Sequence, residues 1–259
     1  MKDAFSGYIF DLDGTIYLGD RLIDGAKEVI AQLQATGKQV LFLTNKTIVS
    51  RGDYVKKLNN FGINVGLENI LSPTLMTIDY LQQHHRDARL YVIGERLIKD
   101  EFASAGLTMA HSPQETDVVV VSWDRGFHYD HLDFAYQAVK NGAVTIATNP
   151  DRTCPVEDGE VPDCGGMIGA IEGATGKKID VIIGKPSTIT ANMALKVLKL
   201  DKSQCLMVGD RVETDIMMGK KAGIQTALVL TGVTRATDLD HASCQPDYVL
   251  DSVKDLLTM

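Results

Sequence analysis

Short runs of aliphatic and β-branched residues alternate along this chain with longer stretches of helical character, and this alternation limits the fold more than any other feature. Tyr8-Ile9-Phe10 leads directly into Asp11, and Val40-Leu41-Phe42-Leu43 is an apolar run without polar alternation. Such a run is typical of a strand buried on both faces, as in a parallel sheet covered by helices. The sequence therefore predicts an α/β fold built on a parallel sheet.

The same pattern places the individual elements. A glycine, which suits the end of a helix, directly follows each of the first two predicted helices. The predicted helices cover residues 25–36, 51–61, 188–198 and 213–222, and the predicted strands cover 90–93, 118–121, 144–147, 181–183, 205–208, 226–230 and 248–250.

Polar residues that directly follow a predicted strand gather before residue 50 and after residue 180, and the middle of the chain carries no comparable chemistry. In an open parallel sheet, ligands bind at the carboxyl ends of the strands. We therefore expect one catalytic domain, made of residues 1–82 and 181–259, that is interrupted by an inserted domain over residues 83–180.

Charge and composition argue against several classes of partner. With 26 Lys and Arg against 34 Asp and Glu, the formal net charge of -8 disfavours a broad nucleic-acid surface. No run of about 18 apolar residues is present to span a membrane, and the start of the chain lacks a secretory pattern. We expect a cytoplasmic protein with reduced thiols, a Cys154–Cys164 disulfide being the less favoured alternative.

The first polar cluster is Asp11-Leu12-Asp13-Gly14-Thr15. If the strand persists, its period of two points Asp11 and Asp13 to the same side. Two carboxylates so close repel each other unless a cation intervenes, and Mg²⁺ is a hard cation that takes oxygen ligands. The alternative is an Asp-rich turn after a strand.

Three further clusters follow predicted strands. Thr44 and Asn45 can donate hydrogen bonds to phosphate oxygens, although they would also suit a helix N-cap. Lys185 can stabilise an anion as a point charge, although a lysine is more often simply exposed. Asp210 follows a strand, and Asp215 falls in the first turn of the next helix, where the helix dipole alone would favour it.

Taken together, these four clusters resemble the four motifs of the haloacid dehalogenase (HAD) superfamily. The long insertion between the second and third motifs resembles the class II cap of the NagD-like, p-nitrophenylphosphatase-type branch. Residues 14–26 (GTIYLGDRLIDGA) look like the turn-and-flap region of that branch, and residues 147–151 (ATNPD) resemble a segment of its caps. The resemblance implies a Rossmann-like core with a parallel sheet plus an inserted α/β cap domain.

The same resemblance implies roles for individual residues. Asp11 would be the nucleophile and Asp13 the general acid and base. The phosphoryl group would bind to Thr44, Asn45 and Lys185. Mg²⁺ would be bound by Asp11, the Asp13 backbone carbonyl, Asp210 and Asp215, the last directly or through a ligand. One departure is Lys46, which stands where many members have a second asparagine.

The implied function is a Mg²⁺-dependent phosphatase that hydrolyses small phosphomonoesters, either sugar phosphates or nucleoside monophosphates, through an aspartyl-phosphate. In the inserted domain, Asn149, Asp151, Cys164 and Gly165 are the candidates for substrate specificity. The alternative is that the Asn149-Pro150-Asp151 segment merely forms a turn. The expected partner is a small-molecule substrate, and a homodimer is left open.

Rival functions are less compatible with the first motif. A dehalogenase needs no leaving-group acid at Asp13, and the ATPases with a similar motif carry Thr there. A non-enzymatic phospho-receiver domain also has an α/β fold with Asp, Thr and Lys. Such a domain lacks an insertion of about a hundred residues, so the sequence favours an enzyme.

Overall fold

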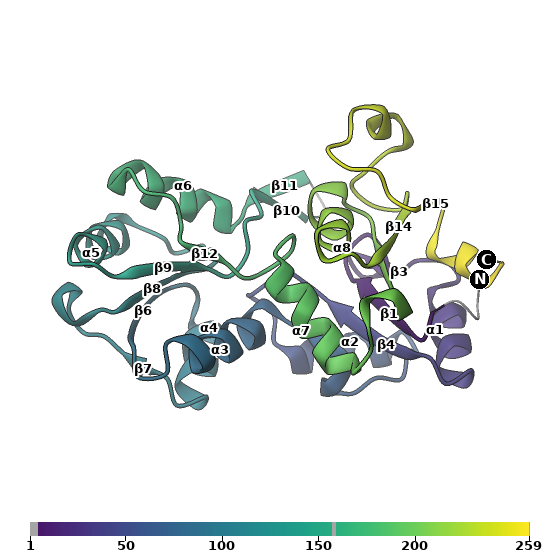
Figure 1. Cartoon of the computed structure of the whole chain (residues 1–259), viewed down its shortest axis with the longest axis horizontal. Coiled ribbons are helices and arrows are strands. Elements are labelled where there is room, and N and C mark those ends of the chain that lie inside the picture. The colour runs from purple at the N-terminus through teal and green to yellow at the C-terminus, as the bar shows by residue number, and fades with distance from the viewer. Residues whose placement is uncertain (1–4, 157–158, 259) are drawn as a thin grey trace. The chain divides into compact units, whose positions relative to one another are not determined.

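The computed structural model describes residues 5–156 and 159–258 (Figure 1). These residues form two compact units. The first unit contains the residues up to Thr44, Arg51–Leu71 and the residues from Lys185 onward, and the second contains Asn45–Ser50 and Ser72–Gly184. The chain thus changes units near residues 71 and 184, whereas the domain limits predicted from the sequence lie at residues 82 and 180.

The first unit is built on a sheet in which all neighbouring strands are parallel. Its strand order is β15-β14-β13-β1-β4-β5. The strands are β1 (Gly7–Asp11), β4 (Gln39–Leu43), β5 (Ile70–Leu71), β13 (Cys205–Gly209), β14 (Gln225–Val229) and β15 (Tyr248–Leu250). A short antiparallel hairpin, β2 (Tyr17–Leu18) with β3 (Arg21–Leu22), follows β1.

Helices connect the strands of this sheet, as the apolar runs predicted. They are α1 (Ala26–Ala35), α2 (Arg51–Asn60), α7 (Thr188–Leu198) and α8 (Met217–Ala222), with short 3-10 turns at Leu67–Asn69, Lys202–Gln204, Ala236–His241 and Val253–Leu257. The prediction of one helix over 213–222 was partly wrong, because Val212–Ile216 is a π-helical turn that precedes α8. In this wider turn the Arg211 amide donates to the Asp215 carboxylate, at 3.1 Å, which draws the acid back toward the strand end.

The second unit has its own parallel sheet, of order β12-β9-β8-β6-β7. Its strands are β6 (Arg89–Ile93), β7 (Thr108–Met109), β8 (Val118–Val121), β9 (Val144–Ala147) and β12 (Val181–Ile182), with a separate hairpin of β10 (Thr153–Val156) and β11 (Gly159–Pro162). Its helices are α3 (Pro73–His84), α4 (Arg96–Ser104), α5 (Tyr129–Lys140) and α6 (Cys164–Thr175), with a 3-10 turn at Pro113–Glu115.

Strand β12 corrects one prediction. The sequence places residues 181–183 in the catalytic half, but Val181 and Ile182 pair with Ile146 and Ala147 of β9 in the second unit. The Asp180 carboxylate accepts hydrogen bonds from the amide and the hydroxyl of Thr145, each 2.8 Å long, and so aligns the two strands. An apolar run identifies a strand but does not determine its partner.

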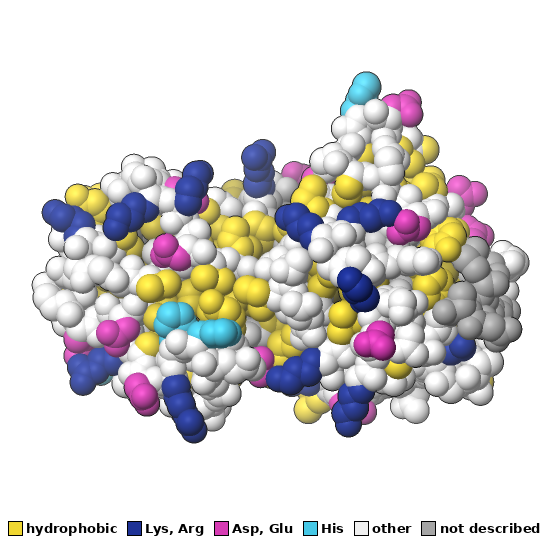
Figure 2. Space-filling view, in the orientation of Figure 1, with side chains coloured by type: hydrophobic (Ala, Val, Ile, Leu, Met, Phe, Trp, Pro, Cys, Tyr) yellow, Lys and Arg dark blue, Asp and Glu magenta, His cyan; other side chains and the backbone are white. Residues whose placement is uncertain are grey.

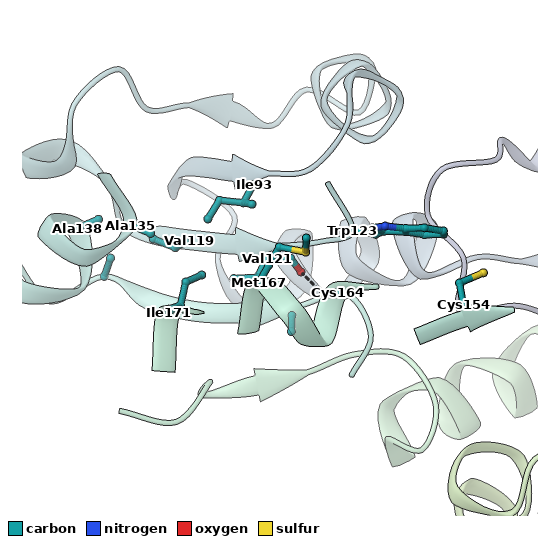
Figure 3. Packing of buried hydrophobic residues seen from close by; sticks show 12 residues of the cluster. Ile93, Val119, Val121, Trp123, Ala135, Ala138, Cys154, Cys164, Met167 and Ile171 are labelled. Atoms are coloured by element: carbon teal, nitrogen blue, oxygen red, sulfur yellow. Dashed lines mark hydrogen bonds between the residues drawn. The ribbon is translucent and has the colours of Figure 1, made fainter. Parts of the chain in front are cut away.

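The core of the second unit lies where α5 and α6 cover β8 (Figure 3). All four residues of β8 are buried, as expected for a central parallel strand. Ala135 and Ala138 of α5 and Met167 and Ile171 of α6 belong to the same buried cluster. This unit therefore has a hydrophobic core of its own.

Among the described residues, no helix combines the length and the apolar character needed to cross a membrane. On the face drawn in Figure 2, Lys and Arg side chains are scattered among acidic and apolar ones instead of forming one stripe.

Replacing Val121 by Ala should destabilise the second unit, because Val121 is 0% exposed in its core. Losing two buried methyl groups and leaving a cavity should lower the free energy of unfolding by about 2–3 kcal/mol. The matched control is Val156→Ala, since Val156 is 45% exposed, and it should change stability by less than about 0.5 kcal/mol. Urea unfolding monitored by circular dichroism measures both, and equal losses would contradict the assigned core.

Candidate active site

The carboxyl ends of neighbouring strands bring the first and last motifs together. Asp11 is the last residue of β1, and Asp210 directly follows β13, which pairs with β1 in parallel register. Both side chains belong to buried residues, Asp11 being 8% and Asp210 3% exposed. The sequence predicted this meeting of two acids from their positions after strands.

Lys185 is the buried cation of this cluster. Its ammonium group forms an ion pair with the Asp11 carboxylate and a second one with Asp215, at 2.7 Å. Burial by itself would lower the pKa of Lys185, but the two carboxylates outweigh that effect and raise it. Lys185 therefore keeps its positive charge inside the protein.

Asp11, Asp210 and Asp215 together form a buried acidic triad. One carboxylate oxygen from each lies within 4.8 Å of the others. Burial raises the pKa of Asp11 well above its ordinary value, and repulsion from Asp215 and Asp210 adds to this effect against the attraction of Lys185. Burial, followed by the charge of Asp215, raises the pKa of Asp210 to about 6.

The donor set of this triad fits a divalent cation. Three carboxylates face one lysine, so the cluster carries excess negative charge if all are ionised, and a bound cation would relieve the repulsion. Carboxylate oxygens are the ligands that Mg²⁺ prefers. Asp13, which the sequence also assigned to the metal through its backbone carbonyl, has its side chain outside the triad.

Glycines make room for the Asp210 side chain. A Cβ atom on Gly14 would lie 2.5 Å from Asp210 Oδ2, and one on Gly232 would lie 1.9 Å from the same oxygen. Gly14 also has a φ of +86°, which other residues rarely adopt. The Val233 amide donates to Asp210 Oδ2 at 2.6 Å, so the carboxylate is held in a space that only glycine leaves open.

Asp13 differs from the triad because it is only half-buried. The chain turns tightly after it, with the Gly14 amide donating to the Tyr17 carbonyl at 2.7 Å. This turn brings the Tyr17 hydroxyl to 3.5 Å from Asp13 Oδ2, to which it donates. Burial, followed by the charge of Asp13, raises the pKa of Tyr17.

Thr44 follows β4 and is buried. Its hydroxyl lies 3.5 Å from the Tyr54 hydroxyl on α2. The sequence patterns assigned no role to Tyr17, although it lies in the segment 14–26, or to Tyr54. The spacing of Tyr54, Lys57 and Phe61, at i, i+3 and i+7, would have indicated one helix face directed at a common neighbour.

Asn45, Asn149 and Asp151 meet within the second unit. The Asn45 side-chain amide donates to both Asp151 carboxylate oxygens, at 3.2 Å each. The Asn149 side chain is buried and donates to the Asn45 carbonyl at 2.9 Å. These bonds fasten the segment Asn45–Ser50 to the unit, while the phosphate-binding role predicted for Asn45 and the specificity role predicted for the other two stay predictions.

Cys164 and Gly165 begin helix α6. Cys164 is fully buried, its Sγ donates to the Val121 carbonyl at 3.5 Å (Figure 3), and burial raises the pKa of its thiol to about 12. The Gly165 amide donates to the Asp151 carbonyl at 2.7 Å, and a Cβ there would lie 2.9 Å from that oxygen. The four cysteines are free thiols. A substrate role for Cys164 and Gly165 stays a prediction.

Comparison with known proteins agrees with this geometry. The family of haloacid dehalogenase-like hydrolases matches residues 8–108, and a second HAD-like hydrolase model matches residues 182–256. The sugar-phosphatase AraL of Bacillus subtilis is 41% identical over 251 residues, which cover 97% of this chain and 92% of that protein. The chain belongs to the haloacid dehalogenase-like hydrolases. The family predicted from the four motifs is confirmed.

Other members of the family share the whole chain. The 5'-nucleotidase YutF of Bacillus subtilis is 36% identical over 96% of each protein. The solved structure of a p-nitrophenyl phosphatase from Archaeoglobus fulgidus superposes with a TM-score of 0.92, at 36% identity and 98% coverage of both chains. These relatives confirm the predicted α/β, Rossmann-like fold and the predicted enzyme class: the chain is a phosphoric monoester hydrolase, and the alternative of a non-enzymatic receiver domain is not supported.

Gly14 and Gly19 offer a matched pair for testing the space around Asp210. Both have a positive φ, but a Cβ on Gly19 would meet nothing within 4 Å. Gly19→Ala should lower the free energy of unfolding by about 1 kcal/mol through backbone strain alone. Gly14→Ala should cost at least about 1 kcal/mol more, because the methyl group displaces the Asp210 carboxylate. Denaturant titration measures the difference, and equal costs would contradict the crowding at Asp210.

Proposed function

We propose that this phosphatase hydrolyses small sugar phosphates, with nucleoside monophosphates as the second substrate class, through an aspartyl-phosphate on Asp11. The observation that carries the proposal is the buried cluster in which Lys185 contacts Asp11 and Asp215 beside Asp210. The sugar phosphatase matched at 41% identity and the 5'-nucleotidase matched at 36% support these two classes in that order.

In the first step, an Asp11 carboxylate oxygen attacks phosphorus in line and forms the acyl phosphate, while the bond from phosphorus to the alcohol oxygen breaks. Lys185 supports this step in two ways. Its charge favours the ionised form of Asp11, which burial and the neighbouring acids oppose. It also stabilises the charge that develops on the transferring phosphoryl oxygens.

Asp13 carries the protons in this proposal. It gives a proton to the departing alcohol and then takes one from the water that hydrolyses the aspartyl-phosphate, which restores both acids. Its half-buried position supports this role, since a group that exchanges protons with substrate and water must be accessible. Thr44 would hold a phosphoryl oxygen through its hydroxyl.

The buried triad would hold Mg²⁺ through Asp11, Asp210 and, directly or through a ligand, Asp215, with the Asp13 carbonyl as a further ligand. When bound, the cation supplies neutralisation of charge on the phosphoryl oxygens. The protein's own part is to keep these acids buried and close together. We also propose that the enzyme acts in the cytoplasm, and that Asn149, Asp151, Cys164 and Gly165 help the second unit to choose the substrate.

A phosphate-release screen over sugar phosphates, nucleoside monophosphates and p-nitrophenyl phosphate tests the function. Asp11→Asn should retain less than about 1% of wild-type turnover, a loss of more than roughly 3 kcal/mol in transition-state stabilisation, because an amide does not attack phosphorus. The control is Asp240→Asn, an exposed acid of the same unit, which should keep wild-type activity. Substantial turnover by a pure Asp11→Asn preparation would refute the nucleophile.

Metal dependence is tested by chelation and by a change in the triad. EDTA should abolish turnover, and Mg²⁺ should restore it. Mg²⁺ should also raise the melting temperature, since a ligand that binds only the folded state stabilises it. Asp210→Ala should lose both the rescue and the thermal shift, whereas Asp240→Ala should keep both. Full activity in chelator would show that the triad is not a metal site.

A further inference from the structure

Tyr17 is the aromatic residue that contacts the proposed proton carrier. Its hydroxyl donates to Asp13 Oδ2 across 3.5 Å, and the residue is 1% exposed. A phenol is a hydrogen-bond donor throughout the ordinary pH range. A donor fixed on one carboxyl oxygen restricts rotation of the carboxyl group, and therefore determines the direction in which the other oxygen faces.

The ring of Tyr17 is itself held from several sides. Lys57 of helix α2 lies over it, with Nζ 4.1 Å from the ring centroid, and Phe61 contacts it with centroids 5.9 Å apart. The Lys57 ammonium also donates to the Gly19 carbonyl at 2.8 Å and so ties α2 to the hairpin that contains Tyr17. An isolated bridge pairs the Tyr17 backbone with Asp13. A hydroxyl mounted this rigidly is suited to orient a neighbour.

We propose that Tyr17 is a positioning residue for Asp13, whose carboxyl it holds in the direction needed to exchange a proton with the leaving group. The proposal rests on the proposed function, in which Asp13 is the general acid and base. The proton still passes from Asp13 to the departing alcohol and returns from water. Tyr17 neither gains nor loses a proton, and it acts only through the orientation of Asp13.

Tyr54 provides a comparison within the same unit. It is also buried, but its hydroxyl lies near Thr44, which would hold the phosphoryl group common to every substrate. Loss of the Tyr54 hydroxyl should therefore affect all substrates alike. Loss of the Tyr17 hydroxyl should affect only those whose leaving group needs a proton.

The experiment compares Tyr17→Phe and Tyr54→Phe on two substrates, an alkyl phosphate such as a sugar phosphate and p-nitrophenyl phosphate. The nitrophenolate ion departs without protonation. Tyr17→Phe should lower kcat for the alkyl phosphate about tenfold with little change in KM, and it should change kcat for p-nitrophenyl phosphate less than about twofold. Phenylalanine keeps the ring that Lys57 and Phe61 contact, so the fold should persist.

Two further variants complete the design. In an Asp13→Asn background, Tyr17→Phe should have no additional effect on the alkyl phosphate, because the residue acts through Asp13. The control is Tyr248→Phe on strand β15, which removes a hydroxyl that donates a hydrogen bond to Gln225 of β14 at 3.1 Å. This variant should hydrolyse both substrates at the wild-type rate. If Tyr17→Phe lowers both substrates equally, or neither, the positioning role is wrong although the phosphatase function stands. A wild-type protein that hydrolyses neither substrate would overturn the proposed function and this role with it.

Discussion

The contact on which the site depends is the buried ion pair of Lys185 with Asp11 and Asp215. An ionised carboxylate without a partner in a protein interior costs several kcal/mol, and here three carboxylates lie close together. One lysine offsets part of that cost and leaves the cluster with an excess of negative charge. This excess of negative charge is unfavourable by itself, and it makes the cluster suited to a cation.

The parallel sheet of the first unit supplies the means of holding these acids. Asp11 ends β1 and Asp210 directly follows its partner strand β13, so the ladder between the two strands sets their backbone positions. Glycines then permit close packing, since a Cβ on Gly209 would lie 2.4 Å from the Asp215 side chain. Backbone geometry thus places the three acids close together, and the Lys185 side chain then pairs with two of them.

In the second unit, hydrogen bonds between uncharged side chains hold the segment Asn45–Ser50. The Thr148 hydroxyl donates to Ser122 at 3.1 Å, and the Ser122 hydroxyl donates to Thr47 at 2.9 Å, all three residues being buried. Together with the hydrogen bonds of Asn45 and Asn149, this series of hydroxyl hydrogen bonds holds the segment Asn45–Ser50 against the rest of the second unit. Within the described residues, the metal-type cluster of acids lies in the first unit alone.

The elements, the family and the principal acids could be predicted from the sequence because they depend on local order. Strands such as Val118–Val121 follow from unbroken apolar runs, and helices such as Thr188–Leu198 follow from helical character. Asp11, Thr44 and Asp210 are recognisable because each lies at or directly after the end of a buried strand. Long-range partners are different. Lys185 reaches Asp11 across 174 positions in the chain, although the strand before it belongs to the other sheet.

The tertiary structure alone decided which polar groups share a neighbour. A π-helical turn places Asp215 beside the other two acids of the triad. Asn45 donates a hydrogen bond to Asp151, and Tyr17 donates one to Asp13. These contacts depend on strand order, on the width of a helical turn and on the packing of α2. None of these leaves a periodic signal in the sequence, because each is settled by how separate segments fit together.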